Sequence, residues 1–221
     1  MDLCHDPLKV PIVLFYSESI ETPEIEANTM PNRRTFFVVT ATSLLPWVRP
    51  TLAQSVDGRA SAFVKNVGDK LVAVLNGPEG EKRAKLTAII DGAVDVDGVA
   101  QFSLGRFWRN ATPEQQQRFI QAFHQVLVKN VTAKLGDYRG VRFTMGRTQQ
   151  RDNNTVVSTI VERPNNPPAN VDWIISNTGN PKIVDLNSEG TSLRMTQRQD
   201  YASYLSHNNN NIDALINEMR R

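Results

Sequence analysis

The ionisable side chains of this sequence form none of the familiar catalytic or metal-binding patterns. Of its three histidines, His124 and His207 lie in the main body of the chain, and neither has a Cys, Glu or second His at metal-ligand spacing. The sequence also lacks a G-x-S-x-G elbow, a Walker loop and a G-x-G-x-x-G fingerprint. We therefore expect a protein that is not an enzyme and that needs no metal and no cofactor.

Two groups of acidic residues could still be considered for chemistry. Asp91, Asp95 and Asp97 lack the ligand spacing and the closing Glu of an EF-hand, so we expect them to cap helices or face solvent. Asp185 is the one carboxylate that could pair with a tyrosine inside a cavity for acid–base catalysis. The candidate partners for such a pair are Tyr138, Tyr201 and Tyr204.

Residues 30–53 have the organisation of a signal peptide. Residues 33–34 are a basic arginine pair, residues 36–48 are mostly apolar but too short to span a membrane, and residues 51–53 provide small side chains for cleavage. The arginine pair fits a Sec or a twin-arginine signal equally well. Residues 1–29 are acidic, unlike a basic n-region, and we interpret them as a wrongly assigned or disordered N-terminal extension.

Residues 54–221 are long enough for one domain with a sizeable core. They contain no cysteine, because the single one is Cys4, so this domain uses neither disulfides nor thiol chemistry. The net charge of the chain is only +2, which does not indicate a nucleic-acid partner. Four arginines near the first predicted strand have no interleaved aromatic residues for base stacking, and we expect them on a solvated sheet face: Arg139, Arg142, Arg147 and Arg151.

The first part of this domain has helical periodicity. Apolar residues recur at helical spacing in residues 59–76 and 81–93, and a shorter apolar segment follows at residues 99–108. Thr112-Pro113-Glu114-Gln115 places an N-cap threonine, a proline at the first helical position and a capping-box glutamine in order. We expect the long helix that starts there to run to about residue 135 and to end at Gly136.

The second part changes to strand periodicity. We expect four strands, each marked by alternation or by β-branched residues: 141–145, 155–161, 171–175 and 182–186. Helical spacing then returns at residues 193–205 and 212–219, on either side of the polar run Asn208–Asn211. This order predicts an α+β domain in which helices pack on one face of an antiparallel sheet of about four strands.

Two segments resemble the MlaC family, also called toluene-tolerance proteins. Residues 104–115 read LGRFWRNATPEQ and are followed by Phe119 and Phe123, which is similar to the family's Leu-Gly-x-aromatic-Trp-Arg block, its helix-opening Ala-Thr-x-x-Gln and its spaced phenylalanines. Residues 183–193 read IVDLNSEGTSL and are similar to its second block, which precedes a closing helix with a basic residue, here Arg198.

The resemblance extends from about residue 56 to residue 219, with two departures. Asn180-Pro181-Lys182 stands where the family often has Trp-Lys, and Met195-Thr196-Gln197 stands where an aromatic-basic pair is frequent. These departures concern the sheet edge and the partner surface.

The resemblance implies an NTF2-like fold with an apolar cavity between the sheet and the helices. It further implies a monomeric periplasmic carrier that binds phospholipid acyl chains and maintains outer-membrane lipid asymmetry. The partners implied are an outer-membrane lipoprotein complex and the substrate-domain subunit of an inner-membrane ABC transporter. On this basis we expect the following residues to bind lipid: Leu71, Leu86, Ile90, Phe102, Trp108, Phe123, Leu127, Val141, Phe143, Trp173 and Ile175.

Three alternatives remain open at this point. A paralogue that carries hopanoid-type lipids would show the same sequence blocks. An NTF2-like dehydratase or isomerase would need the tyrosine–aspartate pair described above. An adaptor without ligand would have a solid core, because apolar composition alone does not distinguish a filled core from a cavity.

Overall fold

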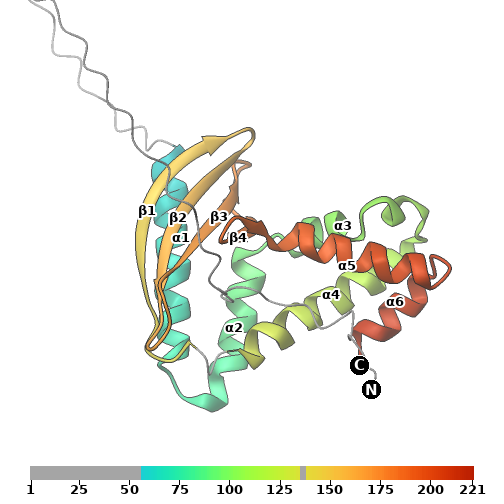
Figure 1. Ribbon diagram of the computed structural model, residues 1–221, viewed down its shortest axis with the longest axis horizontal. Coiled ribbons are helices and arrows are strands. Elements are labelled where there is room, and N and C mark those ends of the chain that lie inside the picture. The colour runs from blue at the N-terminus through green and yellow to red at the C-terminus, as the bar shows by residue number, and fades with distance from the viewer. Residues whose placement is uncertain (1–55, 135–137) are drawn as a thin grey trace, which may run out of the picture. The chain divides into compact units, whose positions relative to one another are not determined.

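The computed structural model describes residues 56–134 and 138–221, which form six α-helices, one 3-10 helix and a five-stranded sheet (Figure 1). The helices are α1 Val56–Leu75, α2 Glu79–Ala93, α3 Val96–Leu104, η1 Gly105–Asn110, α4 Pro113–Ala133, α5 Leu193–His207 and α6 Ile212–Met219. The strands are β1 Arg142–Arg151, β2 Asn154–Glu162, β3 Ala169–Ser176, β4 Ile183–Ser188 and β5 Thr191–Ser192. The predicted N-terminal extension, signal peptide and helix end at Gly136 lie outside the described residues.

The sheet is an antiparallel meander with the strand order β1-β2-β3-β4-β5. The predicted α+β class is confirmed, and the four predicted strands are all present. The strand that the sequence did not reveal is β5, which has two residues and pairs with the end of β4 just before α5 begins. A two-residue strand has no periodicity to detect.

Strand β1 is longer than the alternating pattern predicted, since it continues past Met145 to Arg151. The pairing of β1 with β2 shifts register between Met145 and Thr148, which is a bulge that interrupts the alternation. Gly146 lies inside this bulge, where an added Cβ would lie 3.0 Å from the Ser158 carbonyl oxygen. The backbone therefore approaches its neighbour more closely than most side chains permit.

The helices form two groups around two apolar clusters. Helix α1 lies against β1 and β2 and, together with α2, encloses the first cluster on the inner face of the sheet. The second cluster lies among α3, η1, the start of α4, α5 and α6, away from the sheet (Figure 1). The expected arrangement of helices on a sheet face thus holds for α1, whereas the C-terminal helices form a helical layer with a core of their own.

The predicted capping box of α4 is confirmed. The Gln115 backbone N–H donates to Thr112 Oγ1 at 3.2 Å, and the Thr112 N–H donates to Gln115 Oε1 at 3.1 Å. Asp95 also caps a helix as expected, because its Oδ1 accepts the Gly98 N–H of α3 at 3.1 Å. These caps fix where α3 and α4 begin.

Candidate functional site

An apolar cavity of about 300 Å³ lies between the inner face of the sheet and the helices α1, α2 and α4. Its volume is at the lower end of the range for small-molecule sites in proteins. Helices α3 and α5 line it beside strand β4. The structure therefore contains a ligand-sized space where an adaptor with a solid core would have none.

Eight of the eleven residues predicted to bind lipid line this cavity: Leu71, Leu86, Ile90, Phe123, Leu127, Val141, Phe143 and Trp173. They come from α1, α2, α4, the sheet and the residue just before β1, so segments far apart in sequence meet around one space. Leu86 and Ile90 lie one helical turn apart on α2, and Phe123 and Leu127 do so on α4. The residues that helical periodicity selected on α2 and α4 thus lie on the faces of these helices that line the cavity.

The other three predicted residues lie outside the cavity lining. Phe102 faces α5, where the guanidinium carbons of Arg194 and Arg198 lie 4.3 and 5.1 Å from its ring centre. Trp108 packs against the second cluster from η1. Ile175 is fully buried in the first cluster and makes part of the solid core beside the cavity.

The indole of Trp173 presents an apolar surface to the cavity because its polar atom is bonded elsewhere. Its Nε1–H donates to Thr159 Oγ1 at 2.9 Å, and the Thr159 hydroxyl donates to the Val171 carbonyl oxygen at 3.2 Å. Both Thr159 and Trp173 are buried, so this chain of two bonds satisfies groups that would otherwise be unpaired inside the core.

Asp185 is engaged as a structural anchor between β4 and α5. Its carboxylate accepts hydrogen bonds from the Ser192 hydroxyl at 2.5 Å, the Leu186 N–H at 2.8 Å and the Arg194 N–H at 3.1 Å. Sequence reasoning considered Asp185 as a catalytic base, but these bonds hold the first turn of α5 against the sheet.

The tyrosines named as partners of Asp185 are distributed over different sites. Tyr138 lines the cavity, while Tyr204 donates its hydroxyl to the Ala214 carbonyl oxygen at 3.4 Å. Tyr201 lies in the second cluster with its ring edge-on to Phe119. Burial, with a smaller effect of the Asp200 carboxylate, raises the pKa of the Tyr201 hydroxyl far above its usual value. Among the described residues, no hydrogen bond joins Asp185 to any of these tyrosines.

The end of α2 is tied to two other elements at the edge of the cavity. His124 Nε2 of α4 lies 2.7 Å from Asp91 Oδ1, so this histidine bridges α4 and α2. Lys182 Nζ donates to the carbonyl oxygens of Asp91 at 3.1 Å and Gly92 at 2.7 Å. A cation on these terminal carbonyls stabilises the helix end.

Sequence reasoning missed five polar residues that line the cavity: Ser103, Lys134, Arg194, Thr196 and Gln197. A signal for Gln197 was present, because Leu193, Gln197, Tyr201 and Leu205 follow at four-residue spacing along α5. Tyr201 and Leu205 are fully buried, and Gln197 is also buried, although its side chain is polar. A polar residue inside an otherwise apolar helical stripe indicates either a buried hydrogen-bond partner or a ligand contact.

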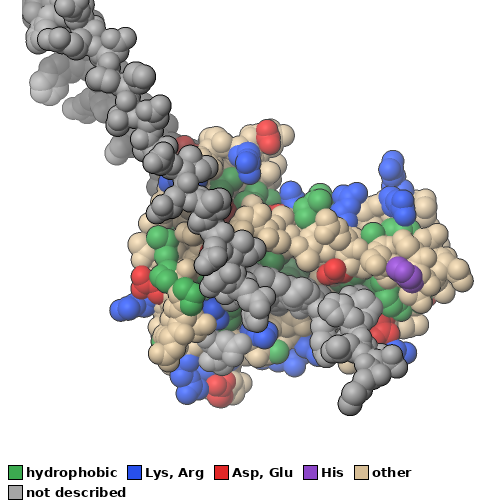
Figure 2. All heavy atoms as spheres, in the orientation of Figure 1, with side chains coloured by type: hydrophobic (Ala, Val, Ile, Leu, Met, Phe, Trp, Pro, Cys, Tyr) green, Lys and Arg blue, Asp and Glu red, His purple; other side chains and the backbone are tan. Residues whose placement is uncertain are grey.

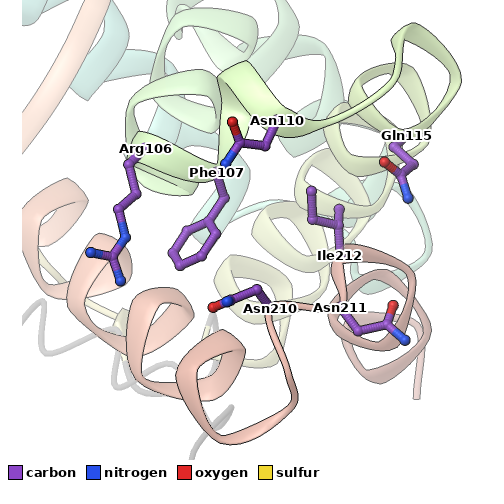
Figure 3. A pocket seen from close by; sticks show the side chains of 7 residues that line it. All are labelled: Arg106, Phe107, Asn110, Gln115, Asn210, Asn211 and Ile212. Atoms are coloured by element: carbon purple, nitrogen blue, oxygen red, sulfur yellow. The ribbon is translucent and has the colours of Figure 1, made fainter.

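A second depression, of about 400 Å³, lies between η1, the start of α4 and the connector between α5 and α6. Figure 3 shows the side chains of Arg106, Asn110 and Asn210 around the ring of Phe107. Its wall is rich in amide and guanidinium groups, so it cannot keep an apolar chain from water. The apolar cavity is therefore the better candidate for the functional site.

The Asn208–Asn211 run, which connects α5 to α6, contributes Asn210 and Asn211 to this second depression. Asn209 and Asn210 have positive φ values of 51° and 56°, a conformation that asparagine tolerates better than most residues. Asn208 Nδ2 donates to the Tyr204 carbonyl oxygen at 2.8 Å, and Asn211 Oδ1 accepts the Ala214 N–H at 3.0 Å to cap α6. The run thus makes the tight turn between two helices.

The remaining surface shows no second centre of chemistry in the part of the chain that the structure describes. Residues 56–134 and 138–221 contain no group of three or more His, Cys, Asp or Glu side chains that could hold a metal ion. None of the described helices combines the length and the hydrophobicity needed to cross a membrane. Lys and Arg side chains are scattered over the face in Figure 2 rather than gathered in one patch.

Comparison with known proteins gives three consistent likenesses. The family model for the MlaC protein matches residues 65–221. Toluene tolerance protein ttg2D from Pseudomonas putida is 26% identical over 134 residues, which is 59% of this chain and 62% of that protein, less than two thirds of its length. A phospholipid-binding protein from Ralstonia solanacearum, solved in complex with a phospholipid, has a TM-score of 0.64 at 25% identity and covers 73% of this chain and 94% of its own. Every residue that lines the cavity falls within residues 65–221.

Proposed function

This chain belongs to the MlaC family, and on that premise we propose that it is a carrier that encloses the acyl chains of a phospholipid in its apolar cavity. The observation that carries the proposal is the cavity itself, which is lined mainly by apolar side chains from α1, α2, α4 and the sheet. The phospholipid in the related Ralstonia solanacearum structure supports this choice of ligand.

The energetics of transfer fit such a site. Each buried methylene group contributes about 0.8 kcal/mol, so about ten methylenes supply on the order of 8 kcal/mol before the entropic costs of binding. Carriage of a lipid requires only that the acyl chains stay out of water and leave again, with no bond made or broken. The cavity therefore needs no nucleophile, general base or metal to do this work.

We further propose that the protein works in the periplasm, where residues 30–53 would direct it as a signal peptide. As a monomer it would move lipid between an outer-membrane lipoprotein complex and an inner-membrane ABC transporter, and so maintain the lipid asymmetry of the outer membrane. Membership of the MlaC family supports this proposal.

The test is native mass spectrometry of the protein purified from the periplasm, followed by extraction of the bound molecule. We expect a mass excess equal to one phospholipid, and the extracted species separates phospholipid from a hopanoid-type lipid. Ile90→Asp places a carboxylate in the cavity wall and should remove the bound lipid. Ile160→Asp is the matched control, because Ile160 is 42% exposed whereas Ile90 is 5% exposed.

A second variant guards against loss of folding in Ile90→Asp. Leu127→Trp fills part of the cavity without adding a charge, and it should lower the fraction of protein that carries lipid while the circular dichroism spectrum stays unchanged. If the wild-type protein carries no lipid, even after incubation with phospholipid vesicles, the carrier proposal is wrong. If Leu127→Trp stays folded and retains all of its lipid, the binding site lies elsewhere.

A further inference from the structure

Three buried atoms that make no hydrogen bond lie on one side of the mostly apolar cavity. Ser103 Oγ of α3, and Arg194 Nε and Gln197 Nε2 of α5, are buried and make no hydrogen bond within the described part of the chain. All three residues line the cavity. Ser103 is 1% exposed and Gln197 is 7% exposed, so bulk water does not solvate either side chain.

The positions of these residues place them on one wall. Arg194 and Gln197 are three residues apart on α5 and therefore share a helix face. Ser103 follows Val99 by one turn on α3, both line the cavity, and α3 packs against α5. Thr196 of α5 and Asp185 of the neighbouring strand β4 also line the cavity, and most of the remaining lining is apolar, so this wall is the place where a polar group of a ligand would find hydrogen-bond partners.

A wholly hydrocarbon ligand would leave these three atoms without a hydrogen bond. A buried donor without an acceptor costs free energy, and native proteins contain few such groups without a reason. An amide N–H and a guanidinium N–H can only donate, and a serine hydroxyl can donate as well. These donors would therefore be satisfied by an acceptor oxygen of the ligand.

The charge of the wall favours a neutral acceptor. Arg194 Nε lies 3.4 Å from Asp185 Oδ2, so the guanidinium already has a carboxylate beside it, and the side chain of Asp185 is 5% exposed. A phosphate or a free carboxylate at this wall would bring a second negative charge close to Asp185. An ester carbonyl oxygen accepts the same hydrogen bonds without that repulsion.

We infer that Ser103, Arg194 and Gln197 form a subsite for the carbonyl oxygen of an acyl ester, so that the cavity distinguishes ester-linked lipids from ether-linked lipids with the same chains. The inference rests on the proposed function, since it names the part of the lipid that this wall binds.

The test is a competition between two lipids that differ only in the linkage. The full-length protein, freed of lipid, is incubated with vesicles of equal parts diacyl and dialkyl-ether phosphatidylethanolamine of the same chain length, and native mass spectrometry gives the bound ratio. We expect the diacyl lipid to be favoured about tenfold, which corresponds to about 1.4 kcal/mol.

Substitutions of Gln197 and Ser103 test whether these residues cause the preference for the diacyl lipid. Gln197→Met keeps the length of the side chain but removes the donor, so the bound ratio should fall toward one, and Ser103→Ala should lower it as well. Gln197→Met should also leave the melting temperature of the lipid-free protein unchanged or raised, because an unpaired buried amide is removed. Gln199→Met on the exposed face of α5 is the control and should retain the wild-type ratio.

The outcomes separate this inference from the proposed function. Equal binding of both lipids by the wild-type protein would overturn the ester subsite and leave the carrier intact. A preference that survives in both Gln197→Met and Ser103→Ala would assign it to other residues and overturn the inference too. Failure to bind either lipid would instead overturn the proposed function.

Discussion

Gly68 lies in the middle of α1 at the point where the ring of Phe143 from β1 crosses the helix. A Cβ added to Gly68 would overlap the outer atoms of that ring, and both residues line the cavity. In Gly68→Ala the ring must therefore move, and the open space available to it is the cavity. We expect this single methyl group to change both the stability of the protein and its capacity for lipid.

The sign of the stability change is set by two opposing contributions. Replacing glycine by alanine inside a helix stabilises it by about 1 kcal/mol. Forcing extra volume into a packed site costs about 1–3 kcal/mol. We expect Gly68→Ala to lower the free energy of unfolding by about 1 kcal/mol and to lower the fraction of protein that carries lipid, measured by urea unfolding and by native mass spectrometry.

A double-mutant cycle isolates the contact with the ring. Phe143→Leu removes the ring atoms that the new Cβ would meet, so in that background Gly68→Ala should instead stabilise the protein by about 0.5–1 kcal/mol. Gly92→Ala on α2 is the matched control, because a Cβ there meets nothing within 4 Å and only the helical gain remains. Equal stabilisation by Gly68→Ala in the wild-type and Phe143→Leu backgrounds would refute the packing of this ring over α1.

Three further perturbations test the structure. Tyr201→Phe removes a buried hydroxyl without a hydrogen-bond partner and should raise the free energy of unfolding by about 1 kcal/mol in a urea titration; a loss of stability would mean that the hydroxyl is bonded. Burial raises the pKa of Asp200, so the folded state binds its proton more tightly than the unfolded state, and this advantage is lost as pH rises above about 4. Asp200→Asn should therefore be more stable than wild type at pH 7 by thermal melting but not at pH 3, and an unchanged difference at both pH values would contradict this assignment. Removal of bound lipid should lower the melting temperature by several degrees, since a ligand at 100 times its Kd contributes about 2.7 kcal/mol; the same treatment of Ile90→Asp should produce no shift.

The elements with strong local signals could be predicted from the sequence. The start of α4 was found at the correct residue because Thr112, Pro113 and Gln115 each satisfy a local requirement of a helix N-terminus. The strands β2 and β3 were found because their alternation or β-branched composition is local as well. Local hydrogen bonding and side-chain periodicity determine these features, so the order of residues is sufficient to identify them.

Which residues of the short helix α3 line the cavity could not be predicted in the same way. Phe102 and Ser103 are neighbours on α3, and the sequence suggested that the aromatic residue faces the cavity. The structure places Ser103 on the cavity wall and turns Phe102 toward Arg194 and Arg198 of α5, residues about ninety positions later in the chain. A contact between a ring and two cations on a distant helix decides this orientation, and nothing near Phe102 in the sequence encodes it.

The existence of a cavity also depends on tertiary structure rather than on composition. Leu86 and Ile175 have similar hydrophobicity, and both are fully buried, yet only Leu86 lines the open space. If it were closed and dry, a space of about 300 Å³ would cost on the order of 7 kcal/mol by the relation found for cavities in protein cores, which is comparable to the whole stability of a typical domain. A chain under selection for stability alone would fill this space, and larger residues at the lining positions of α1 would suffice. The space is therefore best explained by a ligand that fills it for part of the working cycle. The stability that the protein gains when the ligand binds is lost again when the ligand is released.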